Sequence, residues 1–338
     1  MAVQFVKSSV IPFGPAPSSE TEALRTVELC GRTAYKSEDK ITETSAKSFV
    51  LMLKSHGHLS VLEHSNVVLR VAADGAAPSC DAVLKALRDR LPFHRLYSPD
   101  VTGDGGFFIC GNFRAWIETI SFLERDPSLR AFFSNALNRF FPSLFEPGPA
   151  SSEDLSRSVS LVDEDGQIAL LKKNEALDLP AFIFKIVCDR GITHEIVRHR
   201  VFSFTQESTR YVNYRNRGMV LVLPEELEPF YDDRTGEFSE DSPEVREWLH
   251  RAETIFAWYT QDLARGLRPE IARDILPNLL KSEIFVTGRF NGWKHFVTLR
   301  ESKFAHPRIR TVARGIRRYF EAIGLPIASP PDADQAKG

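Results

Sequence analysis

The stretch that decides the fold of this chain is residues 182–214, FIFKIVCDRGITHEIVRHRVFSFTQESTRYVNY. It begins with an apolar, β-branched run at residues 182–188, which predicts a buried strand. Residues 193–199 are expected to follow as a helix. From Arg198 onward, arginine, histidine, hydroxyl and amide side chains stand in close succession. The stretch therefore indicates a mixed α and β protein with a binding site just beyond a strand and a short helix.

This run of donors suits an anionic, planar, hydrogen-bonding ligand. Arginine binds phosphate through two parallel hydrogen bonds, and hydroxyl and backbone N–H groups complete the shell. The alternative is a solvated, charged helix end with a surface loop. Four apolar side chains interleave with the polar ones, which a surface run seldom needs: Val201, Phe202, Phe204 and Tyr211. The pattern favours a phosphate or nucleotide site.

Composition sets the limits for the rest of the chain. It has 338 residues, 43% of them hydrophobic, enough for one large core or two smaller ones. The formal net charge of -2 gives no sign of non-specific nucleic-acid binding. The cysteines form no CxxC pair and have no metal-ligand spacing with histidine, so we expect reduced thiols and no metal site. With no signal peptide and no membrane span in the sequence, a cytoplasmic protein is expected.

Hydrophobic periodicity predicts further elements. Short strands are expected at residues 65–71 and 107–110, and Ser242 and Pro243 fit the cap and first position of a long helix. Helices are predicted at residues 20–33, 42–55, 82–90, 114–123, 129–141, 243–263, 269–276, 291–299 and 309–323. Residues 1–18 show little pattern, and residues 142–165 are expected to form a loop or mobile linker.

Two segments of the chain echo each other. Residues 108–116 are FICGNFRAW, and residues 285–293 are FVTGRFNGW. Each has an apolar strand pattern, a glycine, a short turn towards a helix, and a tryptophan at the end. Both a structural duplication and a chance match account for the echo.

The polar run also resembles the signature of the flavin-dependent thymidylate synthases, which is Arg198-His199-Arg200 followed seven residues later by Ser208 and then Arg210. The segment CDRGITHEIVRHR at residues 188–200 is similar to the lead-in of that signature. HLSVLEH at residues 58–64 resembles a second motif of the family. Ala272-Arg273, Leu276-Pro277 and Leu299-Arg300 resemble its C-terminal elements.

The resemblance implies an α+β fold, with a mixed central sheet and packed helices, that assembles as a homotetramer with shared active sites. It implies reductive methylation of dUMP to dTMP, with FAD as cofactor, methylenetetrahydrofolate as carbon donor and NADPH as reductant. Residues 1–71 and 180–325 would form the catalytic domain. Residues 72–179 would be a mostly helical insertion that could narrow access to the pocket, and residues 326–338 a disordered tail.

The family's nucleotide contacts carry over to Glu195, Arg198, Gln206, Glu207, Ser208, Arg210, Arg273 and Arg300. Ser208 and Arg210 would lie at the phosphate, and Arg273 would come from a neighbouring chain. Arg300 would sit against the uracil, where a guanidinium stabilises charge that develops in the ring. Arg300 and Ser208 are therefore the predicted catalytic residues. No activated Cys–His arrangement is near the motif, and none is needed if flavin and folate handle hydride and methylene.

The flavin contacts that the resemblance implies are Ser60, His58, Arg198, His199, Arg200, Gln206, Arg289, Asn291 and His295. One departure lies within this set. The family usually has asparagine and, two residues later, arginine, whereas here Arg289 and Asn291 have exchanged places. The upstream echo has the family order, Asn112 and then Arg114. The sequence leaves open which copy faces the cofactor.

Structural explanations stay open for several of these residues. Ser208 could cap backbone locally, and His199 could be a capped histidine at a helix end. The remaining alternatives are Arg273 paired to Glu270, Arg300 paired to Glu301, His58 bonded within the core, and purely structural roles for Glu63 and His64. At the level of function, two alternatives remain. One is the same chemistry on another pyrimidine nucleotide such as UMP, and the other is a non-catalytic nucleotide- or RNA-binding protein that only grips phosphate.

Overall fold

The computed structural model describes residues 3–73, 77–88, 94–98, 105–149, 158–210, 212–239 and 242–328. The end of the predicted helix at residues 82–90, part of the predicted linker, Tyr211 and most of the predicted tail lie outside these ranges. None of the described helices is long and apolar enough to cross a membrane. All four cysteines are described, and all are free thiols.

The central sheet has the strand order β2-β7-β12-β8. Its strands are β2 (Ser9–Pro15), β7 (Ala181–Asp189), β12 (Lys281–Arg289) and β8 (Ser203–Gln206). The strand predicted at residues 182–188 is therefore confirmed as β7. The α+β class is confirmed as well, but the sheet predicted to be mixed is antiparallel in all three pairings. Alternation along β7 sends Phe182, Phe184 and Ile186 to one core and Ala181 and Ile183 to the other.

A second antiparallel sheet has the order β4-β5-β3-β6. Its strands are β3 (Val67–Val71), β4 (His94–Tyr97), β5 (Phe107–Gly111) and β6 (Val159–Leu161). Three of the four come from the segment predicted to be a mostly helical insertion. That segment also contributes helices, so it is built as a layered α+β unit around its own sheet.

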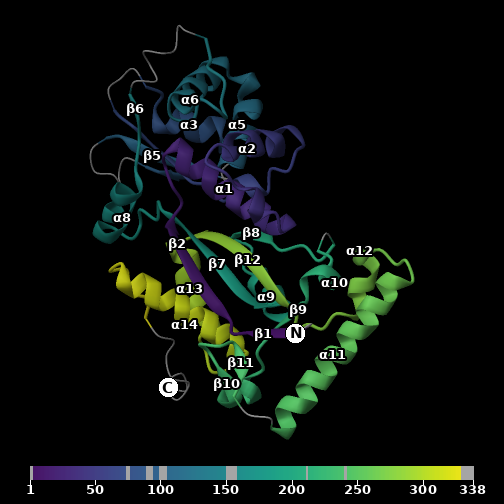
Figure 1. Ribbon diagram of the computed structural model, residues 1–338. Coiled ribbons are helices and arrows are strands. Elements are labelled where there is room, and N and C mark those ends of the chain that lie inside the picture. Colours follow the sequence, from purple (N-terminus) through teal and green to yellow (C-terminus); the bar gives the residue numbers. More distant parts are fainter. Residues whose placement is uncertain are drawn as a thin grey trace.

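Helices cover both sheets (Figure 1). One core joins the first-half helices to the second sheet and to one face of the central sheet. The opposite face of the central sheet packs on the C-terminal helices. The first group is α1 (Glu20–Tyr35), α2 (Ser45–Ser55), α3 (Cys80–Ala86), α5 (Phe113–Phe122) and α6 (Pro127–Phe140). The second is α9 (Arg190–Ile196), α13 (Phe290–Arg300) and α14 (Pro307–Ala322), while α8 (Glu164–Lys173) lies against the second sheet.

A third cluster lies beside the central sheet. The parallel pair β1 (Val3–Val6) and β9 (Met219–Val222) packs on the long helix α11 (Pro243–Ala264) and on α12 (Pro269–Ala272). The predicted cap is confirmed, since the Ser242 hydroxyl accepts from the Val245 N–H at 3.2 Å. The small elements nearby are α10 (Tyr214–Arg217), β10 (Tyr231–Asp232) and β11 (Glu237–Phe238).

The predicted helices all have counterparts, with bounds that move by a few residues. Two predictions were wrong. Residues 1–18 contain β1 and β2, although their polar and proline-rich sequence hides the pattern. The predicted linker at residues 142–165 contains β6 and the start of α8, whose cap Asp163 accepts from the Gly166 N–H at 2.8 Å.

Candidate active site

A pocket of about 950 Å³ opens where β12 turns into α13. Four of the predicted flavin contacts line it: Arg200, Arg289, Asn291 and His295. Of these, Arg200, Asn291 and His295 have exposed side chains. The opposite wall comes from the turn of β5 into α5 and from β4. The echo segments therefore face each other across one pocket.

Next to this pocket, Glu195, Arg300 and His199 form a hydrogen-bonded group. Arg300 donates from NH1 to the Glu195 carboxylate at 2.8 Å and from NH2 to the Glu195 carbonyl at 3.0 Å. Its Nε donates to His199 Nε2 at 3.0 Å. Glu301, the alternative partner, is instead paired with Arg317. The structure therefore brings together Arg300, predicted to lie against the uracil, Glu195, a predicted nucleotide contact, and His199, a predicted flavin contact.

The imidazole of His199 is held in its neutral form. Burial, with added repulsion from Arg300 and His295, lowers the pKa of His199 to about 4. Because Nε2 accepts from Arg300, the ring proton of neutral His199 sits on Nδ1. The ring also contacts Phe202 and His295, which line the pocket. Arg300 thus has a carboxylate and an uncharged acceptor as partners, and both fix its orientation.

The exchanged pair Arg289 and Asn291 differ in their surroundings. The Arg289 guanidinium donates to the Leu179 and Asp178 carbonyls and, at 3.3 Å, to the Asn66 side chain. Asn291 is exposed at the pocket. Its backbone N–H and that of Phe290 donate to the Asp178 carboxylate at 3.2 and 3.0 Å. In this structure Arg289 holds the chain together at the pocket wall. Its contact with a flavin stays a prediction.

The residues predicted at the phosphate form a separate group at the far end of β8. Gln206 donates to Thr193 and Ser282 at 3.0 and 2.9 Å. The Ser208 hydroxyl accepts from the Arg210 N–H at 3.3 Å, as expected for a local backbone cap. Arg273 donates to Thr209 at 2.8 Å, whereas Glu270, its alternative partner, pairs with Arg268. The length of β8 separates this group from Arg200 and the pocket.

Glu207 lies in a buried charge cluster beside that group. Its carboxylate is within 3.4 Å of Lys36 and 3.2 Å of Lys281. Glu283 pairs with the same two lysines and with Lys185. Burial alone would raise the pKa of Glu283, but hydrogen bonds from the three lysines outweigh it and lower the pKa. The partners of Glu207 in this chain are therefore cations, which favours a structural role.

Ser60 and His58 do not reach the pocket. Both are exposed on the connection from α2 to the short 3-10 helix at Val61–Glu63. The alternative that placed His58 in the core is wrong, because its nearest ring partner is the exposed His56. Arg198 is also exposed. Flavin contacts from these three side chains stay a prediction.

Comparison with known proteins finds similarity in the second half of the chain. The family model described as "Thymidylate synthase complementing protein" matches residues 167–325. The flavin-dependent thymidylate synthase of Pyrococcus abyssi is 35% identical over 140 residues, 40% of this chain and 53% of that protein. The enzyme of the same name from Mycobacterium tuberculosis is 33% identical over 138 residues, 40% of this chain and 54% of that protein.

Residues 167–325 are thus similar to flavin-dependent thymidylate synthases. The chain spans about half the length of the relatives that it matches. A crystal structure of the UMP/dUMP methylase PolB from Streptomyces cacaoi with 5-Br UMP aligns at a TM-score of 0.36 and 21% identity. That alignment covers 49% of this chain and 84% of the other.

The segment that matches the family model contains every predicted site residue except His58 and Ser60. It starts at residue 167, inside the segment that we predicted to be an insertion. The first half of the chain, outside this match, nevertheless supplies one wall of the pocket.

Two pocket residues of that first half, Asn112 and Arg114, were not among the predicted contacts. Arg114 donates to Glu63 at 2.8 Å and to Glu118 at 2.9 Å, and its side chain is 40% exposed. Glu63 also accepts from Ser203 at 2.8 Å, so it bridges the two halves of the chain. The signal that could have found these residues is the echo, because Asn112 and Arg114 stand where Arg289 and Asn291 stand in the other copy.

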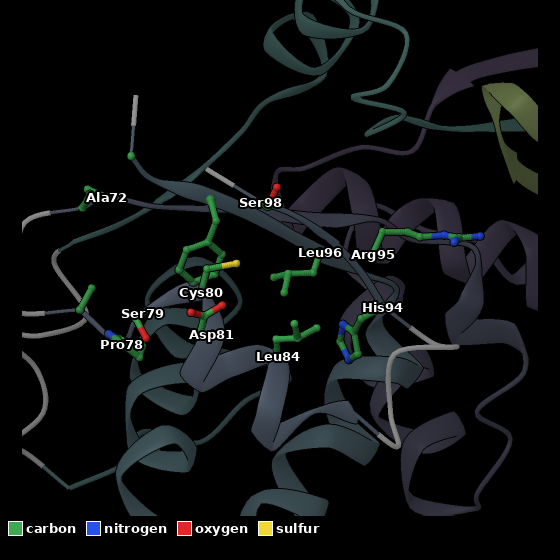
Figure 2. A pocket seen from close by; sticks show the side chains of 14 residues that line it. Ala72, Pro78, Ser79, Cys80, Asp81, Leu84, His94, Arg95, Leu96 and Ser98 are labelled. Carbon is green, nitrogen blue, oxygen red and sulfur yellow. The ribbon is translucent and has the colours of Figure 1, made fainter. Parts of the chain in front are cut away.

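A second pocket, of about 880 Å³, lies between α3 and β4 (Figure 2). It is lined by Cys80, Asp81, Leu84 and Leu96 among others, and none of the predicted site residues contributes. Burial and the neighbouring Asp81 raise the pKa of the Cys80 thiol, which disfavours a nucleophilic thiolate. Its volume is close to that of the first pocket, but the predicted site residues lie in and beside the first pocket.

Proposed function

We propose that this protein catalyses FAD-dependent reductive methylation of dUMP to dTMP, with methylenetetrahydrofolate as carbon donor and NADPH as reductant. The observation that carries the proposal is the group formed by Glu195, Arg300 and His199. It lies next to the pocket, where His199 contacts the lining residues Phe202 and His295, inside the segment that matches the family model, with the arginine held by both neighbours.

Arg300 is the residue that acts on the base. C5 of uracil is a poor nucleophile, and a guanidinium near N3 and O4 stabilises the negative charge that builds up in the ring. Glu195 and neutral His199 hold Arg300 in one orientation before substrate binds, so little reorganisation is needed during the reaction. A protonated His199 would instead repel Arg300, and its low pKa keeps this from happening at neutral pH.

The pocket residues fit a flavin. The exposed donors Arg200, Asn291 and His295 suit the anionic and hydrogen-bonding edges of a dinucleotide, and Phe202 supplies an apolar surface between them. Bound FAD would carry the hydride chemistry, while the protein binds and orients it. No side-chain nucleophile is required of this chain.

The residues predicted to contact the nucleotide phosphate suggest that the chain forms an oligomer. Ser208, Arg210 and Arg273 are separated from the pocket by the length of β8, about 13 Å at the usual rise per residue of a strand. We propose that this group completes the site of a neighbouring copy in a cytoplasmic homotetramer. Ser208, Gln206 and Arg210 would hold the nucleotide there.

The test begins with the visible spectrum of the purified protein, with FAD added first and dUMP second. The expected result is a bound flavin whose spectrum dUMP perturbs, followed by dTMP formation when methylenetetrahydrofolate and NADPH are added. Arg300→Lys should retain flavin and lose turnover. The matched control is Arg314→Lys on α14, an exposed arginine outside this group, which should turn over like the wild type.

Other outcomes separate the alternatives. Methylation of UMP in preference to dUMP would keep the chemistry and change the substrate. A protein that takes up no FAD, and that binds RNA with strong salt dependence, would overturn the proposal in favour of a phosphate-binding role.

A further inference from the structure

The two echo segments occupy the same place in two copies of one structural unit. In each, a strand that is central to its sheet contains a glycine at or one residue before its end, Gly111 in β5 and Gly288 in β12, and a helix begins two residues after that glycine. The phenylalanine of the turn is buried in both, Phe113 and Phe290, as is the tryptophan one turn later, Trp116 and Trp293. The glycine is required in both for close packing. An added Cβ would lie 2.5 Å from His94 at Gly111 and 2.1 Å from Phe202 at Gly288.

The duplication extends to whole sheets. Read from its other edge, the second sheet is β6-β3-β5-β4, and the central sheet is β2-β7-β12-β8. All pairings in both are antiparallel, and the paired registers place His94 opposite Gly111 and Ser203 opposite Thr287. In chain order, each copy has a first strand, one or more helices, a central strand, a short helix, two more strands and two helices, and in the C-terminal copy residues 207–280 are inserted between those two strands, β8 and β12. The copies are residues 9–140 and 159–322.

The two copies have exchanged their first strands. β2, the first strand of the N-terminal copy, pairs with β7 of the C-terminal copy, and β6 pairs in return with β3. Side chains cross the junction as well. Ser18 donates from its backbone and hydroxyl to Glu164 at 2.6 and 2.8 Å. His64 lies 2.7 Å from the Thr287 hydroxyl and 2.8 Å from the Thr205 hydroxyl. The exchange fixes one copy against the other within a single chain.

The pocket near α13 lies on this junction, and equivalent positions of both copies line it. Four pairs of equivalent positions line it: Gly111 with Gly288, Asn112 with Arg289, Arg114 with Asn291, and Ala115 with Gly292. A pocket lined in this way is divided between two repeats. Either copy alone would supply only one wall.

We propose that this pocket is a composite FAD site in which the N-terminal copy binds the cofactor through Arg114, opposite Arg200 and Asn291 of the C-terminal copy. The inference rests on the proposed function for the identity of the ligand. Arg289 is engaged with the Asp178 and Leu179 carbonyls. In the turn of the N-terminal copy that is equivalent to Arg289–Asn291, the Arg114 side chain is 40% exposed, whereas the exposed Arg95 lies outside that turn, on β4. Arg114 of the N-terminal copy then supplies the flavin-binding arginine that the exchange of Arg289 and Asn291 removes from the C-terminal copy.

The test is FAD titration of the full chain, followed by flavin absorbance, with Arg114→Gln, Arg114→Lys and the control Arg125→Gln. Arg125 is an exposed arginine of the same copy that lies outside the pocket lining. Loss of one charge-assisted contact should weaken FAD binding by Arg114→Gln about 10- to 100-fold. Arg114→Lys, which keeps the charge next to Glu63 and Glu118, should recover part of the affinity, and Arg125→Gln should match the wild type.

The outcomes separate this inference from the proposed function. FAD affinity that is unchanged in Arg114→Gln overturns the composite site, even if the protein methylates dUMP. Weakened binding in Arg114→Gln, in a wild-type protein that binds FAD but methylates neither dUMP nor UMP, supports the composite site and overturns the proposed reaction. A wild-type protein that takes up no FAD overturns both. Thermal melting of each variant shows whether a loss of binding comes from unfolding.

Discussion

His64 should make the stability of this fold fall steeply in mild acid. The side chain is fully buried between the two copies, with its ring nitrogens 2.7 and 2.8 Å from the hydroxyls of Thr287 and Thr205. Burial lowers its pKa to about 3, from an ordinary value of 6.5. Between these two pH values, His64 is therefore neutral in the folded protein and protonated in the unfolded chain.

The sign and size follow from that difference. Above pH 6.5 the imidazole is neutral in both states, so its titration leaves the free energy of unfolding unchanged. As the pH falls from 6.5 towards 3, the unfolded chain binds one more proton than the folded chain, and stability is lost. At pH 5 the loss is about 2 kcal/mol, and it approaches about 5 kcal/mol near pH 3. His199, with a lowered pKa, acts in the same direction.

The assay is urea unfolding of wild type and His64→Leu at pH 7.5 and pH 5. His64→Leu should be less stable by about 2–4 kcal/mol at pH 7.5, because two buried hydroxyls lose their partner. Its further loss on going to pH 5 should be about 2 kcal/mol smaller than that of the wild type. The exposed His250→Leu on α11 is the control and should keep the wild-type pH dependence. If His64→Leu and the wild type lose the same free energy between the two pH values, the assignment of a neutral, buried His64 is refuted.

Three further substitutions test the site and its walls. Arg300→Lys should lower kcat for dUMP methylation about 10²–10³-fold, as for loss of a preorganised donor, and single-turnover rates equal to the wild type would contradict the role. Gly288→Ala should destabilise the fold by about 1–3 kcal/mol in urea unfolding, because its Cβ would lie 2.1 Å from Phe202, and an unchanged midpoint would count against this packing. Asp178→Asn should cost about 1 kcal/mol, since one of the two N–H groups at the start of α13 loses its acceptor. Here the same unfolding curve is the measurement, and equal stability would exclude the capping role.

Sequence predicted the elements whose pattern is local. The apolar run of β7, the capped start of α11 at Ser242 and the amphipathic α14 all follow from spacing and caps. β2 and β6 could not be found in this way. Each is an edge strand, β6 with only three residues and β2 interrupted by proline and glycine, and each is fixed by pairing with a strand far away in the chain.

The candidate site shows the same division between local and distant information. The Arg198–Ser208 run marked the region, and the C-terminal resemblance pointed to Arg300. The contacts of Arg300 with Glu195 and His199 join residues about a hundred positions apart. No local pattern could separate Arg289 from Arg114 as the pocket arginine, because the difference is that Arg289 donates to carbonyls of the segment before β7.

The duplication also explains why one half of the chain matches a family and the other does not. Position His94 in the N-terminal copy corresponds to Phe202 in the C-terminal copy, because His94 packs against Gly111 and Phe202 packs against Gly288. Four to two positions before His94 the sequence is Arg90-Leu91-Pro92, and four to two positions before Phe202 it is Arg198-His199-Arg200. The exchanged strands β2 and β6 hold the two copies together. Each copy then needs to supply only one of the two pocket walls. The N-terminal copy can then lack the nucleotide motif while it keeps the fold, the turn and Arg114. Sequence similarity to the family is therefore detected in the copy that has the motif.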